Sequence, residues 1–202
     1  MKHILPFFCV FILLYSSLRG QPSTDFKRNE IGIGTSWFPA YLFIQTETID
    51  NYGIIASYQY KITPSFGIHT GVLYNTRIVV NNSSNLSDKG YFIGSHIGVT
   101  QNIFTIKRWS LYGSLDFLYT YTINENEVYR PHFTTYENRF YSGLGLGTRF
   151  KMSSSLYLEM EFNHGYGYRH YKTIHEDNSI LIEKDWDWDA FKIFGLQLIY
   201  NF

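Results

Sequence analysis

The sequence has 202 residues, with 17 basic and 17 acidic side chains and a single cysteine. A hydrophobic content of 45% without net charge excludes a disordered chain, and the absence of a basic excess argues against nucleic-acid binding. Aromatic residues make up 19% of the chain, and Tyr, Phe, Ile and Thr favour strands over helices. The composition therefore predicts an all-β protein.

The N-terminal segment predicts a signal peptide over residues 1–20. Lys2 provides a basic start, an apolar run covers residues 4–15, and small residues precede a cleavage site after Gly20. An apolar run of about a dozen residues is too short for a helix that spans a bilayer. Cleavage would remove Cys9, so residues 21–202 form the expected mature domain, which has no cysteine for a disulfide.

From residue 28 onward, segments of alternating polarity predict eight strands: 28–38, 51–62, 66–80, 90–106, 109–124, 139–152, 156–171 and 188–202. Three short connections alternate with four long polar ones: 39–50, 81–89, 125–138 and 172–187. This alternation is typical of an up-and-down barrel with tight turns at one rim. A strand of about 12 residues tilted by about 45° rises roughly 29 Å, which is enough to cross the apolar core of a bilayer.

The two faces of each predicted strand differ in polarity. In the seventh predicted strand, Leu158 and Met160 alternate with Glu159 and Glu161. Most glycines of the chain lie on the polar faces of the predicted strands. A soluble lipocalin-like barrel would place this polar face in water, where glycine would only weaken the strands. Small residues instead suit the lumen of a narrow barrel. The pattern predicts an eight-stranded antiparallel up-and-down transmembrane β-barrel whose apolar face contacts lipid.

Charged residues on the polar face are expected to form a network inside the barrel, because an unpaired buried charge is costly. Its expected members are Arg77, Asp116, Arg149, Glu159, Glu161 and Arg169, with His69 and His96 nearby. We expect Arg149 to pair with Glu159 and Glu161, and Asp116 to pair with Arg77 or Arg169.

Tryptophan residues lie near the ends of the predicted strands. Trp109 falls beside a tight turn, whereas Trp37, Trp186 and Trp188 fall near the long connections. Aromatic rings concentrate at both interfaces of a membrane barrel, so these four residues are the predicted aromatic girdle.

The signal peptide, the eight strands, the rhythm of turns and loops, and the terminal Tyr200-Asn201-Phe202 resemble small bacterial outer-membrane β-barrel proteins. The similarity is to the OmpA/OmpX-like and outer membrane protein beta-barrel domain families, over the whole mature chain. It implies a location in the bacterial outer membrane, with both termini in the periplasm. It also implies that Tyr200 and Phe202 form the signal read by the barrel assembly machinery. These families carry a glycine five residues from the end, where this chain has Gln197.

The function expected is that of a non-enzymatic, porin-like membrane barrel with a side-chain-filled lumen and no cofactor or metal. It is expected to be a monomer whose outer loops bind an extracellular or membrane partner, or have a structural role. One alternative is a lipid-modifying acyltransferase or deacylase, which needs Ser, His and a carboxylate to converge. His164 and His170 lie on the apolar face without such partners. A minor gated ion pore is the other alternative.

Overall fold

The structure is a computed structural model that describes residues 27–37, 48–81, 86–126, 132–189 and 194–202. Within these ranges it has nine strands: β1 (Asn29–Trp37), β2 (Thr48–Lys61), β3 (Phe66–Asn81), β4 (Leu86–Ile106), β5 (Trp109–Asn126), β6 (Phe133–Lys151), β7 (Leu156–His175), β8 (Ile180–Asp189) and β9 (Phe194–Asn201). The described residues contain no helix with the length and apolarity needed to span a membrane.

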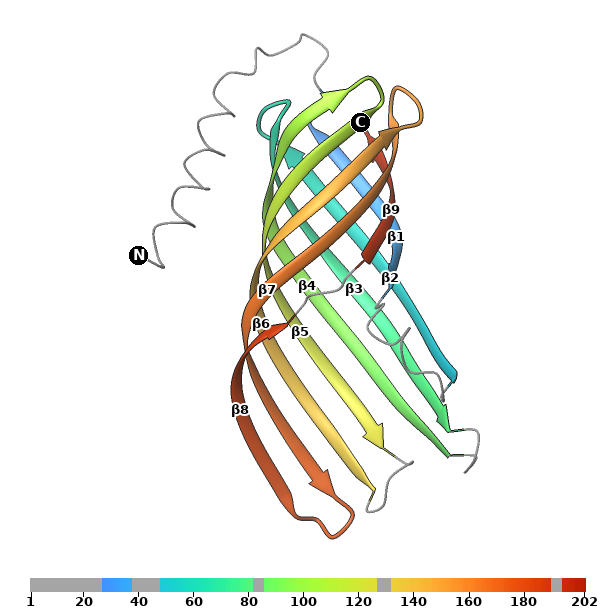
Figure 1. Ribbon diagram of the computed structural model, residues 1–202, viewed down its shortest axis with the longest axis vertical. Coiled ribbons are helices and arrows are strands. Elements are labelled where there is room, and N and C mark those ends of the chain that lie inside the picture. The colour runs from blue at the N-terminus through green and yellow to red at the C-terminus, as the bar shows by residue number, and fades with distance from the viewer. Residues whose placement is uncertain (1–26, 38–47, 82–85, 127–131, 190–193) are drawn as a thin grey trace.

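The strands form a closed antiparallel ring. Each strand from β1 to β7 pairs with the next, and β9 pairs with both β7 and β1 to close the circle. Figure 1 shows a tall barrel with three tight turns and the C-terminus at one end, called here the turn end. The opposite end, where the strands project, is called the loop end. The prediction of an eight-stranded antiparallel β-barrel is confirmed.

The eighth position of the ring is shared by two strands. β9 pairs with β7 from Leu156 to Glu161, whereas β8 pairs with β7 from Gly165 to Ile174. The predicted single strand over 188–202 therefore has the wrong bounds. Charges of both signs at Glu183 and Lys184 made residues 180–187 resemble a loop. The structure extends β8 beyond the closed ring, where a strand can have charged residues on both faces.

Of the predicted loops at 81–89, 125–138 and 172–187, residues 82–85 and 127–131 lie outside the described residues, and the described remainder is largely strand. β4 has 21 residues and β7 has 20, whereas crossing a bilayer requires about 9–11 tilted residues. The additional length projects at the loop end as paired strands (Figure 1). Of the predicted loop at 39–50, residues 39–47 lie outside the described residues, and β2 already begins at Thr48.

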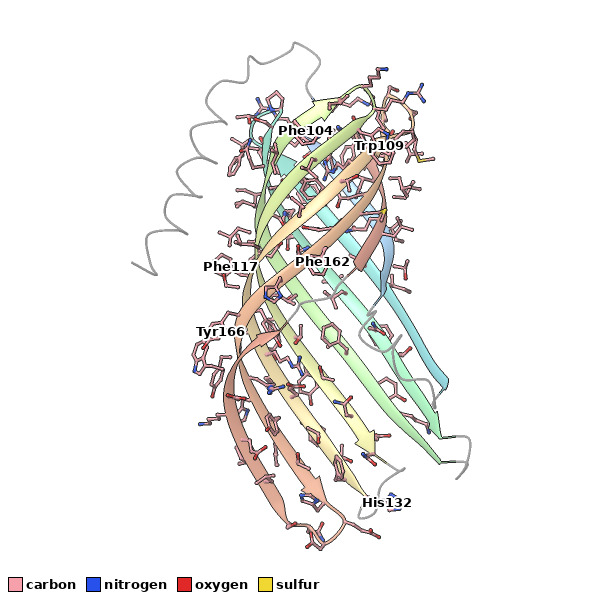
Figure 2. The ribbon with its side chains drawn as sticks, viewed as in Figure 1. Phe104, Trp109, Phe117, His132, Phe162 and Tyr166 are labelled. Carbon is pink, nitrogen blue, oxygen red and sulfur yellow. The ribbon has the colours of Figure 1, made fainter. Side chains whose placement is uncertain are left out.

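Side-chain exposure separates the two faces of the wall. Outward-facing Ile33, Ile97 and Leu144 are 62%, 57% and 60% exposed, whereas inward-facing Glu159 and Asn75 are 5% and 3% exposed. Figure 2 shows the side chains along the wall, with Phe104 and Trp109 at the turn end and His132 at the loop end. The apolar parity therefore faces outward and the polar parity faces inward, as predicted.

Glycines on the inward face make room for larger lumen side chains. A Cβ built on Gly71 would lie 2.6 Å from His96 Cε1, and one on Gly98 would lie 2.9 Å from His69 Nε2. Real Cβ atoms do not approach other atoms so closely. These two glycines thus allow two histidine rings to occupy a narrow lumen.

Candidate functional site

The barrel interior is the candidate site, and its layer nearest the turn end is a charge network centred on Glu30. The Glu30 side chain is 1% exposed and lies 2.5 Å from Lys61 Nζ and 2.8 Å from Arg149 Nη1. Asn201 also donates a hydrogen bond to Glu30, at 3.2 Å. A buried carboxylate is tolerated here because cations and hydrogen bonds replace the lost water.

Arg149 connects four strands through this layer. It lies opposite Glu159 in the β6–β7 register and forms an ion pair with it, and it donates a hydrogen bond to Gln59 Oε1 at 2.7 Å. Arg149 and Glu159 are thus brought together. Glu30, Lys61 and Gln59 were absent from the predicted network, although each shares the inward parity of a glycine on its own strand.

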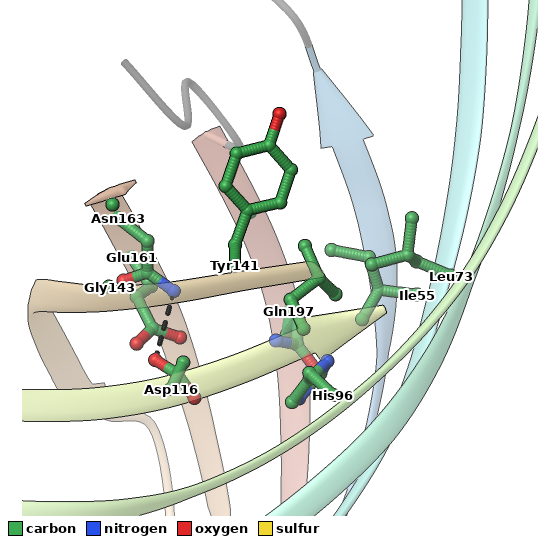
Figure 3. A pocket seen from close by; sticks show the side chains of 12 residues that line it. Ile55, Leu73, His96, Asp116, Tyr141, Gly143, Glu161, Asn163 and Gln197 are labelled. Carbon is green, nitrogen blue, oxygen red and sulfur yellow. Dashed lines mark hydrogen bonds between the residues drawn. The ribbon is translucent and has the colours of Figure 1, made fainter. Parts of the chain in front are cut away.

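A second layer lies deeper in the barrel, around Asp116. His69 Nε2 contacts one oxygen of Asp116, and the Asn163 amide donates to the other at 3.1 Å. Figure 3 shows the bond between Asn163 and Asp116 beside Glu161. Ser114 donates to Glu161 at 2.6 Å. The ion pairs that Arg149 forms with described residues are to Glu30 and Glu159, and Glu161 is not among them.

Asp116 therefore pairs with His69, and Arg169 pairs elsewhere. Asp116 lies opposite Gly143 in the β5–β6 register, whereas Arg169 lies opposite Arg139, nearer the loop end. The side chain of Arg77 lies outside the described residues. Register decides which charges meet, and the sequence alone does not give register.

An apolar layer crosses the middle of the lumen. Ile55, Leu73, Leu118 and Tyr141 are all at most 7% exposed and pack together. A cavity of about 50 Å³ lies between this layer and the Asp116 layer (Figure 3). Since one water needs about 10–15 Å³, the cavity has room for a few water molecules. This layer was not predicted, because single apolar residues interrupt an otherwise polar face.

Between the apolar layer and the loop end, charged side chains form a ladder across β6, β7 and β8. Arg139 forms an ion pair with Glu137 on its own strand. Arg169 lies 3.8 Å from Glu137 and 3.4 Å from Asp185 of β8. The Asp185 side chain is 58% exposed, so this ladder is partly in solvent and Arg169 lies apart from the two buried layers.

The described aromatic residues of the predicted girdle face outward. Trp109 is 55% exposed and its ring centroid lies 4.8 Å from that of Phe150 at the turn end. Trp186 is 61% exposed and its ring lies against Tyr166 and Tyr168 of β7, at 5.7 Å and 5.3 Å. The backbones of Trp37 and Trp188 belong to β1 and β8, but their side chains lie outside the described residues.

The two aromatic residues at the C-terminus also face outward. Tyr200 and Phe202 are 53% and 48% exposed, and their rings stack with centroids 6.2 Å apart. Tyr200 lies between Ile31 of β1 and Leu156 of β7, at the seam that closes the ring. Their part in assembly stays a prediction.

Among the described residues, the interior has one histidine–carboxylate pair, His69 with Asp116. Nδ1 of His69 is buried and has no hydrogen-bond partner among the described residues, so no serine hydroxyl there is positioned for activation. Across the same residues, no three His, Cys, Asp or Glu side chains converge to hold a metal ion. The described pair thus lacks the nucleophile that acyl transfer would require.

Comparison with known proteins supports the fold. No family model matches the sequence, and no curated protein matches it. Among solved structures, the crystal structure of the outer membrane protein OprG from Pseudomonas aeruginosa is similar, with a TM-score of 0.59 at 10% sequence identity. The alignment covers 91% of this chain and 98% of that chain. At this identity, the likeness shows a shared barrel fold.

Proposed function

We propose that the chain is an integral protein of the bacterial outer membrane, a single-chain β-barrel that acts through the strands projecting at its loop end. The observation that carries the proposal is the inverted wall, with apolar side chains outside and ion pairs inside. Such an outer face would be unfavourable in water and is stabilised by lipid. The likeness to OprG supports the same environment.

The filled lumen supports a non-enzymatic role without bulk transport. Side chains occupy the interior in three successive layers: the Glu30 layer, the Asp116 layer and the apolar layer. The apolar layer of Ile55, Leu73, Leu118 and Tyr141 separates the two polar layers from the loop end. An eight-stranded barrel is narrow enough for its own side chains to fill it. The ring closes within one chain, which favours a monomer.

The β7–β8 hairpin is the best candidate for binding a partner. Ile180, Leu181 and Ile182 are 56%, 46% and 57% exposed near its tip. In the part of the chain that the structure describes, β8 has β7 as its single hydrogen-bonded neighbour. An exposed strand edge with apolar side chains can receive a strand from another protein. We therefore assign partner binding to this hairpin, on the cell surface.

Surface labelling tests both the membrane location and the orientation. An epitope inserted at Asn178 in the β7–β8 turn should be labelled on intact cells, whereas one inserted at Ser154 should be labelled only after permeabilisation. The unboiled protein should also migrate faster on a gel than the boiled protein, because the closed barrel is compact. A monodisperse monomer obtained without detergent would overturn the membrane assignment, and the opposite labelling pattern would overturn the orientation.

A further inference from the structure

The mouth of the barrel at the turn end is a basic pocket. It encloses about 260 Å³, and five cationic side chains line it: Lys61, Lys107, Arg108, Arg149 and Lys151. No acidic residue contributes to its lining. The pocket is formed by the inward faces of several strands and by the two-residue turn between β4 and β5.

Two of these five cations are neutralised and three are not. Lys61 pairs with Glu30, and Arg149 pairs with Glu30 and Glu159. Lys107, Arg108 and Lys151 form no ion pair with any described carboxylate. The mouth therefore has three positive charges without an ion-pair partner, whereas the charges of the deeper Lys61 and Arg149 are balanced by Glu30 and Glu159.

The backbone holds these three residues together. The amide of Lys151 donates to the carbonyl oxygen of Arg108 at 2.7 Å, which joins the end of β6 to the turn. Lys107 has a φ of 54°, the left-handed conformation that a two-residue turn uses. The positive charges are therefore placed by a tight turn and a strand end rather than by a long loop.

The pocket is closed on its inner side by the buried network. Tyr112 is 5% exposed and lines the pocket, and its ring centroid lies 5.2 Å from Cζ of Arg149. Gln59 and Arg149, which also line the pocket, are joined by a hydrogen bond of 2.7 Å. The cations at the mouth therefore surround a pocket whose inner wall is fixed by packing and hydrogen bonds.

We propose that this mouth binds a soluble anion that carries two or more phosphate groups. Three uncompensated cations around one pocket suit a multiply charged ligand, since charge-assisted hydrogen bonds to phosphate are the strong ones. Lys151 lies on the inward parity of β6, two residues beyond Arg149. The pocket therefore faces the barrel axis rather than the lipid, which favours a soluble phosphate over a phospholipid headgroup.

Calorimetric titration with tripolyphosphate tests the proposal on the full-length barrel in non-ionic detergent at low salt. The wild-type protein should bind it with one site. Binding should weaken as salt is added, since the Debye length is about 10 Å at 0.1 M ionic strength and exposed charges are screened. An absence of binding at low salt would overturn the proposal.

A pair of charge-matched variants separates the site from the overall charge of the protein. The triple change Lys107→Gln, Arg108→Gln and Lys151→Gln should weaken binding by at least about 30-fold, because it removes the charge-assisted contacts. The control changes Lys89, Lys172 and Lys184 to Gln, which removes three cations from the loop-end half. It should bind within about threefold of wild type, since its cations are remote. Equal weakening in both variants would overturn the site.

Vesicles distinguish the two sources of phosphate. The wild-type barrel is reconstituted in phosphatidylcholine vesicles with and without 20% phosphatidylglycerol, at constant ionic strength. Tripolyphosphate should still bind in the anionic vesicles, because the pocket faces the axis, although the negative surface potential weakens the binding of any anion. If phosphatidylglycerol abolishes binding, the mouth is occupied by a lipid headgroup and the soluble ligand is excluded. Migration of unboiled samples on a gel confirms that each variant is folded.

Discussion

The turn end and the loop end of this barrel place charges in opposite ways. At the turn end, Glu30 and Glu159 are buried and paired, and the uncompensated charges are cations at the mouth. At the loop end, carboxylates such as Asp185 are exposed, and the pairs form an open ladder. One set of continuous strands therefore builds both a buried network and a solvated hairpin. The change occurs at the apolar layer.

The largest effect should come from breaking the turn-end network at its centre. Replacing Arg149 with Met leaves Glu30 and Glu159 without their shared cation, and we expect the free energy of unfolding to fall by about 3–5 kcal/mol. Urea unfolding in lipid vesicles measures this. Lys151→Met, two residues along the same strand, is the control and should change stability by less than about 0.5 kcal/mol. Similar values for both variants would contradict a buried network.

The next largest effect should come from an arginine placed on the outer face, which should destabilise the lipid-facing wall more than the projecting hairpin. Leu144 lies outward on β6 between Leu115 and His164, so Leu144→Arg places a cation in lipid and should destabilise the barrel by about 2–4 kcal/mol. Ile182→Arg, on the projecting part of β8, should cost less than about 1 kcal/mol because water solvates it. The same unfolding assay applies. Equal costs would place both positions in the same environment and would remove the distinction between the two ends.

The smallest expected effect concerns the tip of the β7–β8 hairpin. Hydrogen bonds from the Ser179 hydroxyl and amide lower the pKa of the exposed Asp177 carboxyl below its ordinary value. A lowered pKa means that the carboxylate stabilises the turn above the ordinary pKa and that this contribution is lost as pH falls through the lowered value. Asp177→Ala should therefore accelerate exchange of the Ser179 amide at neutral pH and leave global unfolding unchanged. Glu176→Ala is the control, and equal exchange in the two variants would contradict the assigned hydrogen bond.

Parity along the strands was sufficient to predict the ring and its inverted wall. The alternation of Leu158 and Met160 with Glu159 and Glu161 separates the two faces without any knowledge of neighbours, because a strand repeats every two residues. The short turns were equally clear, since each interrupts this period. These features depend on local sequence, which is why they could be predicted.

Pairing across the lumen could not be predicted in the same way. Whether Asp116 meets His69 or Arg169 depends on register between strands far apart in sequence, and parity leaves register open. The outer strands were missed for another reason. Beyond the apolar layer, β8 has polar residues on both faces, so Glu183, Lys184 and Asp185 lack the alternation that identifies a strand in the membrane.

Glu30 has a further consequence for how the chain folds. Its partners Arg149 and Asn201 lie 119 and 171 residues away in the sequence, and the bond to Asn201 adds to the backbone pairing of β1 with β9. Contacts between such distant segments form slowly, because closing a long loop costs entropy before the contact can compensate. The ring therefore cannot close before the final strand is made, and a chain truncated before β9 would retain β1 as a free edge and leave Glu30 without the hydrogen bond from Asn201.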